Sequence, residues 1–149
     1  MSNIYLYVLL ALAAGAVLPT QAAVNNKLAE FAGGPVAAAF ISFAVGTLVL
    51  FVYMLISGVH LAEMTSAKNA PVIAWIGGIL GAFFVTSTIM LLPRLGVAMT
   101  FSIVIAGQMV LTLIIDHFGL LGVPEKPVSL PRIAGALLVT AGVILIRRF

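Results

Sequence analysis

Five apolar runs follow one another along the chain, and short stretches between them hold most of the charged residues. Each run has roughly 17 to 24 residues, so that a helix formed by it can cross a hydrocarbon core of about 30 Å. Proline stands near the start of three runs, where its missing N–H leaves no helical hydrogen bond unmade. The pattern predicts five transmembrane helices in one domain, residues 1–149, with helices near residues 4–26, 35–57, 71–92, 96–118 and 131–146.

Composition supports the same class of protein. Of the 149 residues, 63% are hydrophobic and only 7% are charged, whereas a soluble domain of this size needs a charged surface. The net charge of +3 comes from a few basic residues beside the apolar runs, a placement typical of membrane topology rather than of nucleic-acid binding. The sequence therefore predicts an all-α integral membrane protein in contact with the lipid bilayer.

The basic residues give only a weak signal for orientation. Because the predicted number of helices is odd, the two termini lie on opposite sides of the membrane. The basic residues divide three against four between the sides, namely Lys68, Lys126 and Arg132 on the N-terminal side and Lys27, Arg94, Arg147 and Arg148 on the other. So small a difference allows insertion in both orientations and hence an antiparallel homodimer. The alternative is that Arg147 and Arg148 fix the C-terminus in the cytoplasm.

Polar side chains within the first predicted helix are the first candidates for a binding site. Gln21 and Asn25 are four residues apart, so they share one helix face. Polar groups are costly in lipid and tend to face a neighbouring helix or a wet cavity. Gln21 is a candidate substrate ligand or a helix-packing residue, and Asn25 is either a substrate ligand or part of the wet end of the helix.

Further candidates lie in the third and fourth predicted helices. Gln108, Thr112 and Asp116 follow one another at intervals of four and form one polar stripe. Thr86 and Ser87 belong to a run of hydroxyl side chains in the third helix. These groups line a substrate cavity or hydrogen-bond to neighbouring helices and to their own backbone.

Asp116 and His117 form an adjacent acid and imidazole at the predicted end of the fourth helix, where both reach the headgroup region. Arg132, across the next loop, is the expected partner of Asp116, and we expect these residues and Arg94 to be structural anchors. Neighbouring residues do not share a helix face, so the Asp116 and His117 pair alone does not form a metal site.

Gly135 and Gly142 are seven residues apart in the last predicted helix and therefore lie on nearly one face. Small residues let another helix backbone approach closely. This face is the predicted packing surface for a second subunit.

Five stretches of the sequence together form a distinctive combination, namely QAAVNNKLA, SFAVGTLVL, LLPRLGVAMTFS, GQMVLTLIIDHFGLLG and PRIAGALLVTAGVILI. In this combination the chain resembles, over essentially its whole length, the YdcZ-type five-helix family of the drug/metabolite transporter superfamily. The resemblance implies a multi-pass protein of a bacterial inner membrane, paired in opposite orientations as half of a ten-helix dimer. Four-helix relatives carry a glutamate in the first membrane helix, whereas this chain has Gln21 and no acid there, which argues against exchange of cationic drugs.

The preferred interpretation is a small secondary transporter subunit that moves a small polar metabolite by alternating access as an antiparallel homodimer. The alternative is a non-transporting assembly or accessory protein, in which the same polar residues only pack helices. A channel would need a continuous polar path, and the chain has too few polar residues for one. No nucleophile, base and orienting acid occur together in the predicted spans, so we expect neither an enzyme nor a cofactor.

The charge distribution generates a prediction about topology. Reporters fused to the C-terminus are expected to show both cytoplasmic and external populations, and replacing Arg147 and Arg148 with neutral residues should shift the ratio strongly. Protease accessibility in the native membrane measures the two populations. A single population in the wild-type chain would exclude dual topology.

Overall fold

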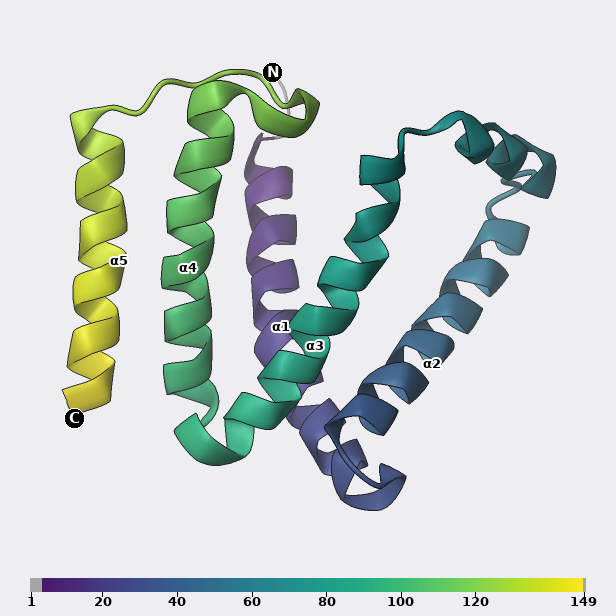
Figure 1. Ribbon diagram of the computed structural model, residues 1–149, viewed down its shortest axis with the longest axis horizontal. Helices are drawn as coiled ribbons and strands as arrows, with labels where there is room; N and C mark the ends of the chain where they lie inside the picture. The colour runs from purple at the N-terminus through teal and green to yellow at the C-terminus, as the bar shows by residue number, and fades with distance from the viewer. Residues whose placement is uncertain (1–3, 149) are drawn as a thin grey trace. The chain divides into compact units, whose positions relative to one another are not determined.

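A computed structural model describes residues 4–148, apart from the side chain of Leu61. The described chain has helices as its regular secondary structure and contains no strand (Figure 1). Its long helices are α1 (Ile4–Ala32), α2 (Pro35–Ile56), α3 (Ile76–Leu95), α4 (Val97–Phe118) and α5 (Leu130–Arg148), and its short 3-10 helices are η1 (Leu61–Asn69), η2 (Val72–Trp75) and η3 (Leu120–Gly122). Five segments are long and apolar enough to cross a membrane, α3 together with η2 being one of them. The predicted all-α class and the five candidate spans are thus confirmed for the described residues.

The first helix is longer than predicted, because it continues past Asn26 to Ala32. Two glycines with positive φ angles, Gly33 at +82° and Gly34 at +130°, end it. The Gly34 N–H donates to the carbonyl of Ala29 at 3.1 Å, which satisfies a carbonyl of the last turn. Asn25 therefore lies inside α1 and is not part of a wet helix end.

Pro35 and Pro71, which stand at the predicted starts of the second and third helices, have different roles in the structure. Pro35 opens α2 at its first position, as predicted. Pro71 precedes the short helix η2, and α3 begins only at Ile76. Helix α3 also runs on through Pro93 to Leu95, so that Gly96, with a φ of +76°, is the only residue between α3 and α4. Helix α5 extends to Arg148, two residues beyond its predicted end.

The chain divides into two compact units, the first ending at Pro93 and the second beginning at Arg94. In the first unit, α1 and α2 run antiparallel from the Gly33–Gly34 turn and pack against each other. Ala38 and Ala39 of α2 form the buried core of this unit together with Val85 and Ile89 of α3. Alanine has almost no side chain to separate two helices, so this core depends on close backbone approach.

The second unit consists of α4, the short helix η3 and α5. Helices α4 and α5 pack along each other (Figure 1). Helix α4 ends at Gly119, whose φ of +58° gives the left-handed C-terminal cap that glycine tolerates best. The chain then passes through η3 and an extended stretch to the start of α5.

Few side chains are buried in either unit. Large apolar side chains such as Leu10, Val49, Ile79 and Leu138 are well exposed along the long helices. In water such surfaces would be unstable, whereas lipid tails cover them at no cost. The exposed apolar surface is therefore what a chain of membrane-spanning helices requires.

The close packing of α2 generates a stability prediction. Ala38 is fully buried, so Ala38→Leu is expected to lower the free energy of unfolding by about 1–3 kcal/mol, because the added atoms must push helices apart. Ala44→Leu is the matched control, since Ala44 is exposed on the same helix. Thermal unfolding in detergent measures both. An equal loss in the two variants would show that Ala38 is not a packing contact.

Candidate functional site

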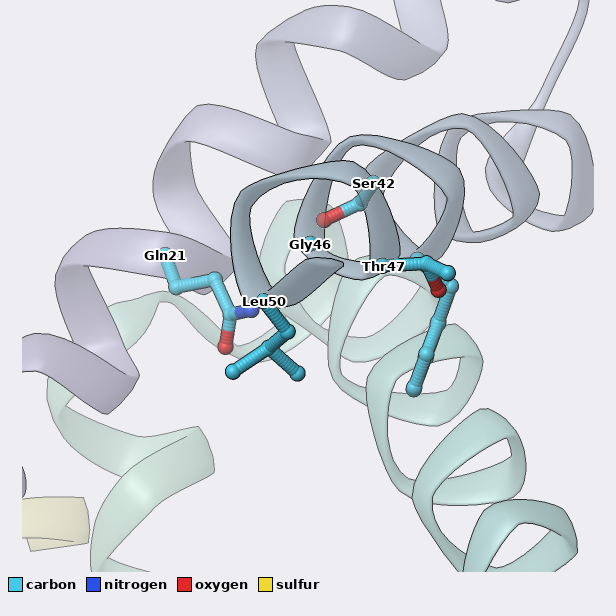
Figure 2. A pocket seen from close by; sticks show the side chains of 6 residues that line it. Gln21, Ser42, Gly46, Thr47 and Leu50 are labelled. Carbon is cyan, nitrogen blue, oxygen red and sulfur yellow. The ribbon is translucent and has the colours of Figure 1, made fainter. Parts of the chain in front are cut away.

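A polar groove lies between α1 and α2 in the first unit (Figure 2). Its volume is about 220 Å³. The residues that line this polar groove are Gln21 of α1 and Ser42, Phe43, Gly46, Thr47 and Leu50 of α2. Figure 2 shows Gln21 extending from α1 toward α2, along which the other labelled residues lie. Gln21 is thus a predicted site residue that lines this groove, and it is exposed at the surface of the described chain.

The antiparallel register of α1 and α2 explains why these residues meet. Gln21 comes 12 residues before Gly33, and Gly46 comes 12 residues after Gly34, so the two lie at about the same level of the pair. Gly46 has no side chain, and a Cβ built there would find no atom within 4 Å. The groove is therefore the space that a larger residue at position 46 would fill.

The hydroxyl groups in the groove are available for a ligand. Elsewhere in the long helices, Thr20, Thr88, Thr100, Thr112 and Thr140 each donate to a backbone carbonyl three or four residues earlier. No such bond is present for Ser42 or Thr47 within the described residues, and the Gln21 amide likewise has no protein partner there. Amide and hydroxyl groups each offer both a donor and an acceptor. The groove can accordingly hydrogen-bond an uncharged polar molecule.

Sequence reasoning missed Ser42 and Thr47. Both stand in the apolar run that forms α2, where an isolated hydroxyl is usually bonded to its own helix. The signal that would have found them is the register set by the Gly33–Gly34 turn, which brings residues 42 to 50 opposite Gln21. That turn was not predicted, because the first helix was expected to end near residue 26.

The other predicted substrate ligands do not line this groove. Asn25 is buried in α1, and Thr86 and Ser87 are half-buried on α3. In the second unit the Gln108 side chain is exposed, and the Thr112 hydroxyl donates to the Gln108 carbonyl at 2.7 Å. The three residues of the predicted polar stripe thus have different environments. The Gln108 amide is exposed, the Thr112 hydroxyl donates to its own helix, and the Asp116 carboxylate forms an ion pair.

Two further hollows follow the seam between α4 and α5. One, of about 220 Å³, is lined by Thr112, Arg132 and Gly135 among others, and the second, of about 170 Å³, includes Gly142 in its lining. A Cβ added to either glycine would meet no atom within 4 Å. Gly135 and Gly142 therefore border α4 of the same chain, with open space beside them.

The acid and imidazole at the end of α4 join the helix to the following loop. The Arg132 guanidinium donates to the Asp116 carboxylate, the partner that the sequence analysis expected, and to the Lys126 carbonyl at 2.7 Å. The Lys126 N–H donates to the Asp116 carbonyl at 2.7 Å, and the Val128 N–H donates to His117 Nδ1 at 3.2 Å. His117 Nδ1 is the acceptor of the second of these bonds. These four bonds hold the loop and the start of α5 against the end of α4.

Arg94, the remaining predicted anchor, is exposed in the last turn of α3. Within residues 4–148, no three His, Cys, Asp or Glu side chains come close enough together to hold a metal ion. Hydrogen bonding is thus the chemistry that the polar groove offers.

A comparison with protein-family models gives a match over residues 6–145, nearly the whole chain, to a family described as "Putative inner membrane exporter, YdcZ". The chain belongs to the YdcZ family. This confirms the resemblance found in the sequence. No curated protein and no solved structure matched the chain. Membership of the YdcZ family, together with five apolar helices, supports a multi-pass inner-membrane protein of the exporter class.

The hydrogen bonds at the end of α4 generate a prediction for this member of the YdcZ family. Asp116 and Arg132 have side chains only 24% and 30% exposed, so Asp116→Asn is expected to lower the free energy of unfolding by about 1–3 kcal/mol. Glu30→Gln is the matched control, because the Lys27–Glu30 pair is exposed and should contribute less than about 1 kcal/mol. Thermal unfolding compares the two. Equal losses would argue against a structural role for Asp116.

Proposed function

We propose that this chain is the subunit of a small secondary transporter that moves a small polar metabolite by alternating access. The observation that carries the proposal is the polar groove, an open groove between two candidate membrane spans that Gln21, Ser42 and Thr47 line. Membership of an exporter family supports the same activity.

The depth of the groove supports a transport site. Gly46 is the twelfth of the 22 residues of α2, a helix of about 33 Å, so the groove lies near the middle of the span. Polar side chains at that depth are costly unless they face a partner or a wet cavity. Transporters bind their substrates near the bilayer midplane, where both sides of the membrane can be reached by a small rearrangement.

The composition of the groove favours an uncharged substrate. Its polar groups are one amide and two hydroxyls, and no acidic or basic side chain lines it. A bound ion would therefore lose its hydration without gaining a counter-charge, which is strongly unfavourable in a low-dielectric interior. Amide and hydroxyl groups instead match a ligand that both donates and accepts hydrogen bonds.

The proposed assembly is an antiparallel homodimer. The three-against-four division of basic residues supports insertion in both orientations. Gly135 and Gly142 leave open space beside the α4 and α5 seam, which supports close approach of a second copy. In such a dimer, inward-open and outward-open states have similar energies, as alternating access requires.

The proposal predicts which polar groups transport depends on. Gln21→Leu is expected to reduce flux about tenfold or more, and Thr47→Val by a smaller factor, because each removes a hydrogen-bonding group from the groove. Thr140→Val is the matched control for Thr47→Val, since the Thr140 hydroxyl donates to its own helix at 3.0 Å. Flux of a panel of small uncharged polyols, sugars and amides into proteoliposomes is the measurement.

Two outcomes would contradict the proposal. Flux equal to that of protein-free liposomes for every compound would favour the non-transporting assembly protein. Equal flux in wild type, Gln21→Leu and Thr47→Val would show transport by another route. Circular dichroism and gel filtration of each variant ensure that a loss of flux does not reflect unfolding.

A further inference from the structure

The polar groove also has an apolar part. Two of the residues of α2 that line it, Ser42 and Thr47, carry hydroxyl groups. The others, Phe43, Gly46 and Leu50, have no polar side-chain atom, and we call these three residues the apolar floor. Because successive residues of a helix are about 100° apart, the apolar floor lies between the two hydroxyl residues around the axis of α2. Hydroxyl groups therefore border the apolar floor on both sides.

The Phe43 ring of the apolar floor is positioned by a contact with α3. A Cβ built at Gly81 would lie 3.4 Å from Phe43 Cζ and 3.7 Å from Phe43 Cε1, so the ring packs directly over this glycine. The neighbouring glycines of α3, Gly77 and Gly78, have no such contact. The ring nevertheless remains exposed and lines the groove. The apolar floor thus includes an aromatic surface that a second helix holds in place.

This arrangement discriminates among uncharged compounds. A hydroxyl that faced Phe43 or Leu50 would lose its water partners without gaining a partner from the protein, which is unfavourable. An apolar group in the same place would instead be removed from water against apolar atoms, which is favourable. A compound with hydroxyls on every carbon therefore fits the groove less well than one with a single polar end.

We propose that the ligand of the polar groove is a small neutral amphipathic compound, an inference that rests on the proposed function. Its polar end is a group such as a carboxamide that pairs with Gln21, because two amides can each donate to and accept from the other. Its apolar remainder packs on Phe43 and Leu50. The groove of about 220 Å³ has the volume of about seven water molecules, which limits the ligand to a small compound. Polyols and sugars are then poor ligands.

The experiment compares pentanamide with glyceramide, the amide of glyceric acid. The two compounds have the same carboxamide and equal numbers of heavy atoms, and they differ in whether the remainder is apolar or hydroxylated. Thermal unfolding of the full chain in lipid nanodiscs is followed over a concentration series of each compound. Half of the maximal protection of wild type is expected at an about tenfold lower concentration of pentanamide than of glyceramide.

Three variants connect this preference with the groove. Leu50→Ser should abolish the preference for pentanamide, because a hydroxyl then replaces part of the apolar floor. Leu48→Ser is the matched control and should keep the preference, since Leu48 and Leu50 are 62% and 64% exposed but only Leu50 lines the groove. Gln21→Leu should lose protection by both compounds, because both use the carboxamide to pair with Gln21.

Several results would overturn the amphipathic ligand. They are protection of wild type by neither compound, equal or stronger protection by glyceramide, an unchanged preference in Leu50→Ser, and loss of the preference in Leu48→Ser as well. Pentanamide protection of Gln21→Leu equal to that of wild type would also overturn it, because the compound would then act through the lipid.

The flux measurements separate this inference from the proposed function. If the amphipathic ligand is overturned while Gln21→Leu and Thr47→Val still reduce flux of another compound, the proposed function stands with a different substrate class. Absence of flux in wild type for every compound would instead refute the proposed function.

Discussion

Hydrocarbon offers no hydrogen-bond partner, and this absence decides how every polar group in the chain is used. The backbone meets the constraint by forming long helices, in which each interior N–H and C=O is paired within its own segment. Hydroxyl side chains meet it by donating to the preceding turn, as those of Thr20, Thr88, Thr112 and Thr140 do. What distinguishes the polar groove is that the side chains of Gln21, Ser42 and Thr47 have no hydrogen-bond partner within the described residues.

Small residues determine where space is left and where it is closed. Ala38 and Ala39 let α2 approach its neighbours near the Gly33–Gly34 turn, and the buried core of the first unit forms there. Gly81 of α3 faces the ring of Phe43, where an added Cβ would come within 3.4 Å of the ring. Farther from the turn, Gly46 leaves the groove open. Alanine with its single methyl group and glycine with no side chain thus give a tight core at one end and an open groove farther along.

The charged residues at the end of α4 perform a different task. Asp116 has the wrong sign for a helix C-terminus, where the backbone dipole favours positive charge. Arg132 supplies that positive charge and also binds the Lys126 carbonyl, while His117 accepts from Val128. The presence of Asp116 and His117 in a very apolar chain is therefore explained by the loop that they hold against the end of α4. Thr112 and Arg132 border a separate hollow between α4 and α5.

The sequence by itself determined the number of candidate spans, the all-α class and the pairing of Asp116 with Arg132, because these follow from run length, hydrophobicity and charge within a short segment. It also singled out Gln21, since an amide within an apolar run is conspicuous. Only the tertiary structure decided that α1 continues to Ala32, that the Gly33–Gly34 turn brings Ser42 and Thr47 opposite Gln21, and that Asn25 is buried with an unsatisfied donor. The physical reason is that a groove depends on the register of two helices, which a turn of two glycines sets and which hydrophobic periodicity does not encode.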